Sequence, residues 1–126
     1  AGNIYIDTSI TLKNAAMAGR KTVRVRHTNM DHAVSEVLLR YGFLKKVEVK
    51  GRMPKRSLEL SLNPERKIES VRLLSTPSLR RYDTYRNFGM VKGGLGILVV
   101  STPKGVKSGI EAKKEKVGGQ LLFEVW

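Results

Sequence analysis

The chain has 126 residues, 40% of them hydrophobic and 28% charged, which suits one compact domain or two small lobes and excludes a large multidomain enzyme. It carries 24 Lys and Arg against 11 Asp and Glu, and the resulting net charge of +13 favours a polyanionic partner such as nucleic acid. It has no cysteine, which excludes disulfides, thiolate metal sites and cysteine nucleophiles.

The N-terminal residues predict a first helix. Three polar residues, Asp7, Thr8 and Ser9, are each able to cap its start. The helix would then turn Ile10, Met17 and its alanines toward a core.

A strand, a second helix and two further strands follow along the chain. Thr22–Arg26 alternates valines with basic residues, the pattern of a half-exposed strand. The strongest helical pattern begins after Asn29, its predicted cap, and ends at Gly42. Leu44–Lys50 and Ser57–Leu62 alternate again and predict two strands.

The second half is richer in predicted strands. Ile68–Leu74 and Arg80–Tyr85 are expected to be extended. Ile97–Ser101 is continuously apolar up to its last residue and predicts a strand buried on both faces. Ser108 has capping-box spacing and predicts a short helix, and Leu121–Trp126 predicts a final strand.

We therefore expect an α+β protein of two small lobes. Residues 1–63 would form a helix-strand-helix-strand-strand lobe, and residues 64–126 a mainly β, RNA-binding lobe with one short helix. The boundary is expected at Asn63-Pro64, where a polar stretch interrupts the pattern. The longest apolar stretch, Leu95–Val100, is far too short to cross a bilayer, so no membrane association is expected.

Catalytic and metal-binding arrangements are poorly supported. His27 and His32 have only Asp31 nearby as a further ligand. The glycines of Gly93–Gly96 lack the spacing of a phosphate-binding loop, and no His and carboxylate pair marks Ser101 as a nucleophile. We therefore expect no catalytic residues, no metal, no cofactor and no small-molecule substrate.

Two segments predict RNA binding. Arg80, Arg81 and Tyr82 combine guanidinium groups with a phenolic ring, which suits phosphates and unpaired bases, although such residues also occur on ordinary solvated strands. The turn after the buried strand offers hydroxyls, backbone amides and a lysine, and a later glycine pair is followed by an amide. The candidate RNA-binding residues are Arg80, Arg81, Tyr82, Ser101, Thr102, Lys104, Gly105, Lys107, Gly118, Gly119 and Gln120.

These residues belong to a longer pattern, which is Gly94-Leu95-Gly96-Ile97, Ser101-Thr102, Gly105-Val106, Ala112 and Gly118-Gly119. In order and spacing it resembles the signature of the small-subunit ribosomal protein S-eight family. An upstream segment, Ser75, Pro77, Leu79, Arg80 and Tyr82, is similar to that family too.

The resemblance implies a non-catalytic constituent of the small ribosomal subunit, in a bacterial cytoplasm or an organelle interior. Its C-terminal lobe would bind the central domain of the small-subunit ribosomal RNA and stabilise that fold during assembly, beside neighbouring small-subunit proteins. Ser101-Thr102 would contact the RNA, with Gly118 and Gly119 on the same face. Gln120 departs from the family's usual Glu. An RNA-modifying or RNA-cleaving enzyme and a basic nucleic-acid-binding regulator are the alternatives.

Overall fold

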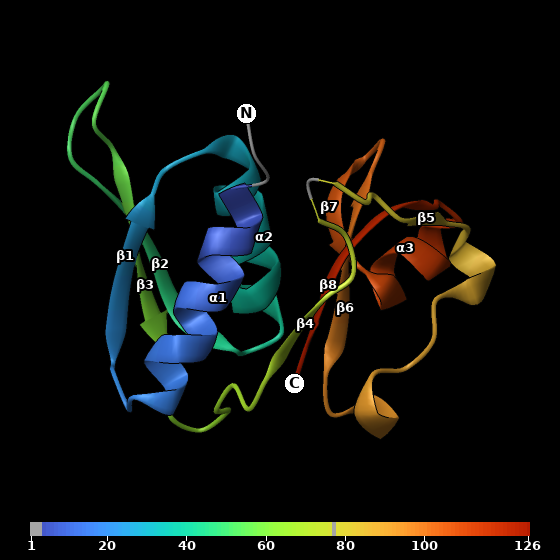
Figure 1. The fold of residues 1–126 in the computed structure, drawn as a ribbon, viewed down its shortest axis with the longest axis horizontal. Helices are drawn as coiled ribbons and strands as arrows, with labels where there is room; N and C mark the ends of the chain where they lie inside the picture. The colour runs from blue at the N-terminus through green and yellow to red at the C-terminus, as the bar shows by residue number, and fades with distance from the viewer. Residues whose placement is uncertain (1–3, 77) are drawn as a thin grey trace. The chain divides into compact units, whose positions relative to one another are not determined.

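The protein has a mixed α+β fold, as predicted. A computed structural model describes residues 4–76 and 78–126 and divides them into two compact units, Ile4–Glu69 and Ser70–Trp126 (Figure 1). We expected the division after Asn63. The Asn63 side-chain amide donates to the Gly42 carbonyl at 2.8 Å and Ile68 is buried, so the polar segment stays with the N-terminal unit.

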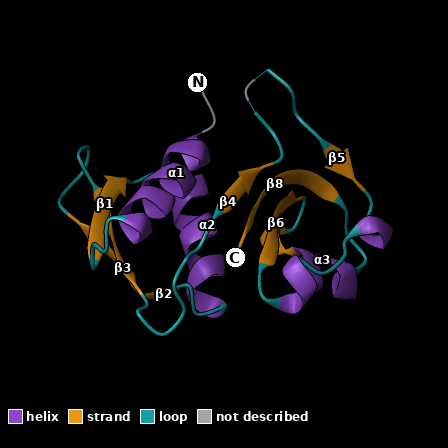
Figure 2. Ribbon diagram, turned by 60° about the horizontal axis from the view of Figure 1, so that its bottom comes forward, coloured by secondary structure: helices purple, strands orange, loops and turns teal. Residues whose placement is uncertain are grey.

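The N-terminal unit places two helices on a three-stranded antiparallel sheet. Its elements are α1 (Ile4–Met17), β1 (Thr22–Arg26), α2 (Asn29–Arg40), β2 (Leu44–Lys50) and β3 (Ser57–Leu62). The strand order is β1-β3-β2, and both helices lie on the same side of the sheet (Figures 1 and 2). The bounds of all three strands agree with the alternating patterns, and Leu58 and Leu60 of the central strand are fully buried.

The start of α1 was predicted wrongly. The helix already includes Ile4, so Thr8 and Ser9 lie inside it and are buried, while the side chain of Asp7 lies outside the described part. The Thr8 hydroxyl donates to Oδ1 of buried Asp31 in α2 at 2.6 Å, which explains why a polar residue faces the core here.

The buried face of α1 agrees with the prediction only in part. Ile10 and Met17 are 42% and 70% exposed. Ala15 and Ala16 are buried, as predicted, and Leu12 is buried with them. The core face therefore consists of small and polar residues with one leucine, a combination that gives little hydrophobic contrast around the helix.

The cap of α2 is Thr28, not Asn29. The Thr28 hydroxyl accepts a hydrogen bond from the Asp31 amide at 3.0 Å and donates to Oδ2 of Asp31 at 2.8 Å. A threonine with extended backbone can accept a hydrogen bond from a free amide of the first helical turn, as an asparagine one residue later could. The sequence pattern alone therefore does not distinguish the two caps.

The C-terminal unit is a five-stranded antiparallel sheet with a short helix. Its elements are β4 (Val71–Leu73), β5 (Tyr82–Asp83), two 3₁₀ turns (Tyr85–Asn87 and Lys92–Gly94), β6 (Ile97–Thr102), β7 (Gly105–Ser108), α3 (Gly109–Glu115) and β8 (Gly119–Val125). The order is β4-β8-β6-β7 (Figure 1), and β5 pairs with the start of β8, on the same edge of β8 as β4.

Several bounds in this unit differ from the predictions. Of the expected extended segment Ile68–Leu74, only β4 pairs as a strand. Of Arg80–Tyr85, only β5 does. The Asp83 carboxylate accepts from the Thr84 amide at 2.8 Å and from Asn87 Nδ2 at 2.6 Å, and so turns the chain into the first 3₁₀ turn. β6 is buried from Ile97 to Val100, as predicted.

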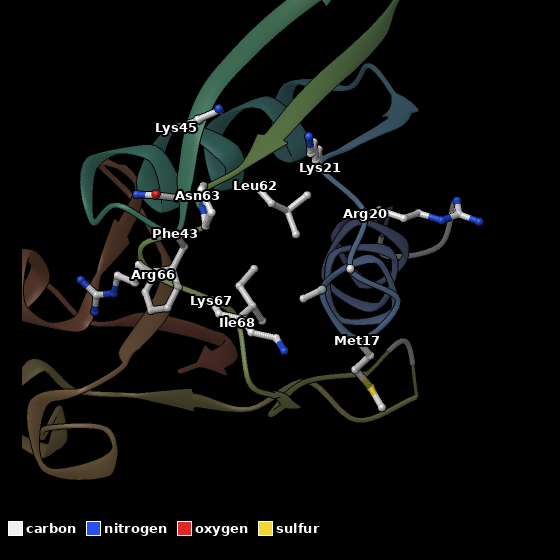
Figure 3. A pocket seen from close by; sticks show the side chains of 13 residues that line it. Met17, Arg20, Lys21, Phe43, Lys45, Leu62, Asn63, Arg66, Lys67 and Ile68 are labelled. Atoms are coloured by element: carbon white, nitrogen blue, oxygen red, sulfur yellow. The ribbon is translucent and has the colours of Figure 1, made fainter.

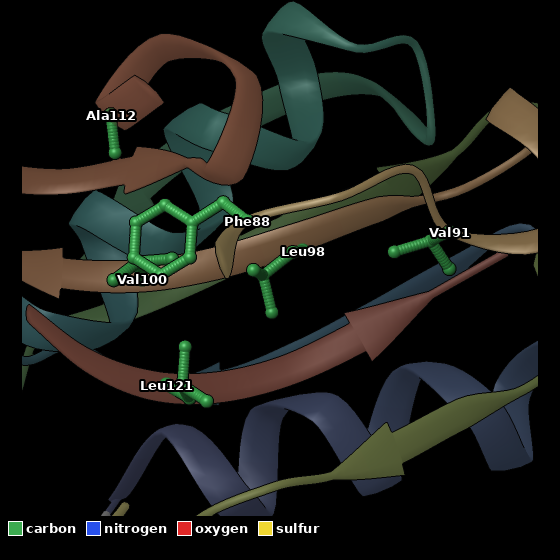
Figure 4. Close-up of a cluster of buried hydrophobic side chains, with 6 residues drawn as sticks. All are labelled: Phe88, Val91, Leu98, Val100, Ala112 and Leu121. Carbon is green, nitrogen blue, oxygen red and sulfur yellow. The ribbon is translucent and has the colours of Figure 1, made fainter. Parts of the chain in front are cut away.

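One face of this sheet forms a hydrophobic cluster with α3 and the preceding loops (Figure 4). Its buried members are Phe88, Val91, Leu98, Val100, Ala112 and Leu121. The predicted capping box holds α3 in place: the Ser108 hydroxyl accepts from the Glu111 amide at 3.1 Å, and Glu111 Oε1 accepts from the Ser108 amide at 2.9 Å. Within the described residues, no helix is long and apolar enough to span a membrane.

Candidate nucleic-acid interface

Three polar side chains lie in one row at the end of the C-terminal sheet. Gln120 in β8 is directly opposite Tyr82 in β5 on one side and Ser101 in β6 on the other. Residues directly opposite in antiparallel strands point to the same face. We call Tyr82, Gln120 and Ser101 the polar row; it spans two strand spacings, roughly 10 Å.

The polar row has hydrogen-bonding capacity to spare. Tyr82 is 67% exposed, and Ser101 and Gln120 are half-buried. Within the described ranges 4–76 and 78–126, none of the three side chains has a hydrogen-bond partner. A hydroxyl, an amide and a phenol are thus free to accept from and donate to a ligand on this face.

Gly118 and Gly119 allow the strands beside the row to approach closely. A β-carbon on Gly119 would lie 2.0 Å from the Ser101 carbonyl oxygen, and one on Gly118 would lie 2.5 Å from the Asp83 carbonyl oxygen. Both contacts are with backbone, which cannot swing away as a side chain does. The paired glycines therefore set the spacing of β5, β8 and β6, and with it the geometry of the polar row.

Thr102 and Ser101 play different parts. Thr102 is only 8% exposed; its hydroxyl donates to the Gly105 carbonyl at 2.7 Å and accepts from the Lys104 amide at 3.1 Å. Gly105 has φ +112°, a conformation that other residues rarely adopt. Thr102 thus closes the β6–β7 turn, which presents Lys104 to solvent.

Arg80 and Arg81 precede Tyr82 and are both exposed. Their segment is held to the sheet by its backbone: the Arg81 amide donates to the Oγ of buried Ser75 at 2.9 Å, and the Leu121 amide donates to the Arg81 carbonyl at 2.8 Å. Pro77, part of the same predicted segment, lies outside the described residues. Two exposed arginines therefore directly precede Tyr82, at one end of the polar row, in the chain.

Lys107 lies apart from the other candidates. It is opposite Val100, whose neighbour Ser101 belongs to the row, so alternation along the strand turns Lys107 to the other face of the sheet. There its Nζ is 2.9 Å from Oε2 of Glu115 in α3. The remaining candidates lie on neighbouring strands and turns at one end of the sheet, whereas Lys107 forms an ion pair with α3.

Asp83 and Asn87 were missed by the sequence reasoning. The hydrogen bond from Asn87, followed by that from the Thr84 amide, holds the pKa of the Asp83 carboxyl below its ordinary value. The same two hydrogen bonds order the chain just after Tyr82. An Asp followed by a turn-forming polar residue was the signal that could have identified it.

The two histidines also have a structural explanation. Their ring centroids are 5.4 Å apart, and Nε2 of His32 lies 3.2 Å from Oε1 of Glu36 one helical turn on. No three His, Asp or Glu side chains in the described part of the chain gather as metal ligands would.

The fold and this surface define a class: a small, basic, two-unit α+β protein that presents a polar sheet end flanked by cations. Comparison with known proteins gives the family. The model of ribosomal protein S8 matches residues 4–126, and the chain belongs to that family, whose members are structural, non-enzymatic proteins of the small ribosomal subunit.

Individual relatives agree. The chain is 36% identical to small ribosomal subunit protein uS8 of Thermoanaerobacter sp. (strain X514), covering 95% of this chain and 94% of that protein. It is 36% identical to uS8 of Dictyoglomus thermophilum, with the same coverage. It is 32% identical to small ribosomal subunit protein uS8c of Pelargonium hortorum, covering 92% of both. The predicted resemblance and the non-enzymatic class are thereby confirmed.

Proposed function

We propose that the C-terminal unit binds small-subunit ribosomal RNA, in its central domain, through the polar row, and stabilises the RNA fold during assembly. The observation that carries the proposal is the row itself: three side chains without hydrogen-bond partners in the described residues, on one face, beside exposed cations.

Each chemical group suits a feature of folded RNA. The Ser101 hydroxyl and the Gln120 amide can bond 2′-hydroxyls, phosphates and base edges at close range. The Tyr82 ring can stack on an unpaired base. Arg80, Arg81 and Lys104 can neutralise nearby phosphates, which contributes affinity without reading sequence.

Gln120 gives this member of the family its own chemistry at the centre of the row. A carboxylate only accepts hydrogen bonds, whereas the Gln120 amide has two donors and one acceptor. It can therefore bond a phosphate or a carbonyl that would repel a carboxylate. Gly118 and Gly119 take part indirectly, because they bring the strands that carry the row to their spacing.

Single alanine substitutions at Ser101 and Thr102 test the proposal. Ser101→Ala should weaken binding to small-subunit ribosomal RNA about tenfold, equal to ~1.4 kcal/mol, and leave the melting temperature unchanged, because its hydroxyl has no partner in the described residues. Thr102→Ala should instead lower the stability by about 1 kcal/mol, since it removes the hydrogen bond to Gly105.

Titration of a fluorescent ribosomal RNA fragment and urea unfolding measure the two quantities separately. If Ser101→Ala binds RNA as tightly as the unmodified chain does, the row is not the RNA contact. If it unfolds as readily as Thr102→Ala, Ser101 is a structural residue.

A further inference from the structure

The N-terminal unit contains a cavity that the proposed RNA surface does not use. Its volume is about 540 Å³, within the range of roughly 300–1,000 Å³ usual for ligand pockets. It lies among the end of α1, the start of β2, the end of β3 and the segment that follows β3 (Figure 3). All of its lining residues belong to the N-terminal unit.

The cavity has an apolar floor and a basic rim. Phe43 and Ile68 form the buried bottom, and Leu62 and exposed Met17 line its sides. The basic lining residues are Arg20, Lys21, Lys45, Arg66 and Lys67. Figure 3 shows Arg20 and Arg66 on opposite sides, with Leu62 and Ile68 between them.

The rim has no compensating negative charge of its own. None of the lining residues is Asp or Glu. In the part of the chain that the structure describes, no acidic side chain pairs with Arg20, Lys21, Lys45 or Lys67, and all four are exposed. Carboxylates brought by a ligand would therefore be attracted from several sides of the opening.

The floor suits an apolar side chain better than a nucleobase. Asn63 supplies the one uncharged polar side chain among the lining residues, and it is occupied: Nδ2 donates to Gly42 and Oδ1 accepts from the Glu65 amide at 3.0 Å. The guanidinium of Arg66 lies 4.1 Å from the centroid of the Phe43 ring and covers a face on which a base would stack. The amino groups of a base would therefore find no free side-chain acceptor among the lining residues, although the rim cations could still donate to its ring nitrogens and carbonyls.

We propose that this cavity binds an acidic segment of a partner protein that inserts one large apolar side chain between flanking carboxylates. The apolar side chain would contact Leu62, Met17 and Ile68. The carboxylates would face the rim cations. A small ligand-sized cavity surrounded by charge is the arrangement of an anchor pocket, where burial of one residue supplies affinity and the rim selects the partner. The inference does not depend on RNA binding by the C-terminal unit.

The test uses the full chain and a fluorescent heptapeptide of glutamates with a central phenylalanine. Fluorescence anisotropy should detect binding, and a central alanine should weaken it at least fivefold. Arg20→Glu with Lys67→Glu should weaken it at least tenfold. The matched control, Arg52→Glu with Lys55→Glu, changes the net charge equally at the exposed β2–β3 turn and should change the affinity less than twofold.

Three outcomes would overturn the proposal. Equal binding of the phenylalanine and alanine peptides would show that the apolar floor is not used. Equal losses in the two charge-reversal variants would show attraction by net charge alone. Binding of a uridine hexanucleotide that competes with the peptide and is lost only in the rim variant would make the cavity an RNA site. The peptide comparison requires no altered protein, so it stands even if a variant fails to fold.

Discussion

Replacing Gly119 by alanine is expected to lower the free energy of unfolding by about 3 kcal/mol, at the upper end for overpacked sites, and to weaken RNA binding more than tenfold. A β-carbon there would lie 2.0 Å from the Ser101 carbonyl oxygen, so β8 and β6 must separate. Separation breaks the register that aligns Ser101 with Gln120. Urea unfolding measures the loss of stability, and RNA titration without denaturant measures the loss of affinity.

Gly89→Ala is the matched control. Gly89 lies in the same unit, is exposed, does not have positive φ, and a β-carbon there would meet no atom within 4 Å. Its substitution should be neutral or stabilise the protein by up to about 1 kcal/mol, because alanine lowers the conformational entropy of the unfolded chain. If Gly119→Ala is as harmless as Gly89→Ala, the close approach of the strands is not what the glycine pair provides.

The second large effect is expected at Asp31. Asp31→Ala should destabilise the protein by about 3 kcal/mol, because hydrogen bonds to a buried charged group are stronger than neutral ones. The substitution leaves the Thr8 and Thr28 hydroxyls without their acceptor and removes a negative charge from the first turn of α2. Thermal unfolding followed by circular dichroism measures the loss.

Two comparisons sharpen this experiment. Asp31→Asn keeps one carbonyl oxygen and should lose less stability than Asp31→Ala. Glu36→Ala removes only the partly exposed pair with His32 on the same helix and should cost about 0.5 kcal/mol or less. A loss at Asp31 no larger than that at Glu36 would contradict a structural role for the buried carboxylate.

Much of the fold could be predicted because alternation and capping are local. β1, β2 and β3 and the capping box of α3 depend on residues close together in sequence. The register of α1 could not be predicted in that way. Thr8 is buried because it meets Asp31, which lies 23 residues away, and no local pattern reveals such a partner. Local rules favoured Ile10 and Met17, which are exposed, together with the alanines, of which Ala15 and Ala16 are buried.

The candidate site shows the same division. The residues of the polar row were named from chemistry and family likeness, but their alignment follows from strand pairing across three strands. In the sequence, Thr102 offers the same hydroxyl chemistry as Ser101, and Lys107 offers the same charge as Lys104. Only tertiary contacts show that Thr102 closes a turn and that Lys107 pairs with Glu115.

Photo-crosslinking from position 82 tests the central proposal most directly. A photoreactive phenylalanine analogue replaces Tyr82 in one chain and Ile110, an exposed residue of α3, in the control. Irradiation in cells followed by sequencing of attached RNA should recover small-subunit ribosomal RNA, concentrated in one region, from position 82 and little from position 110. Attachment at position 82 only to protein, or equal RNA recovery from both positions, would contradict the account.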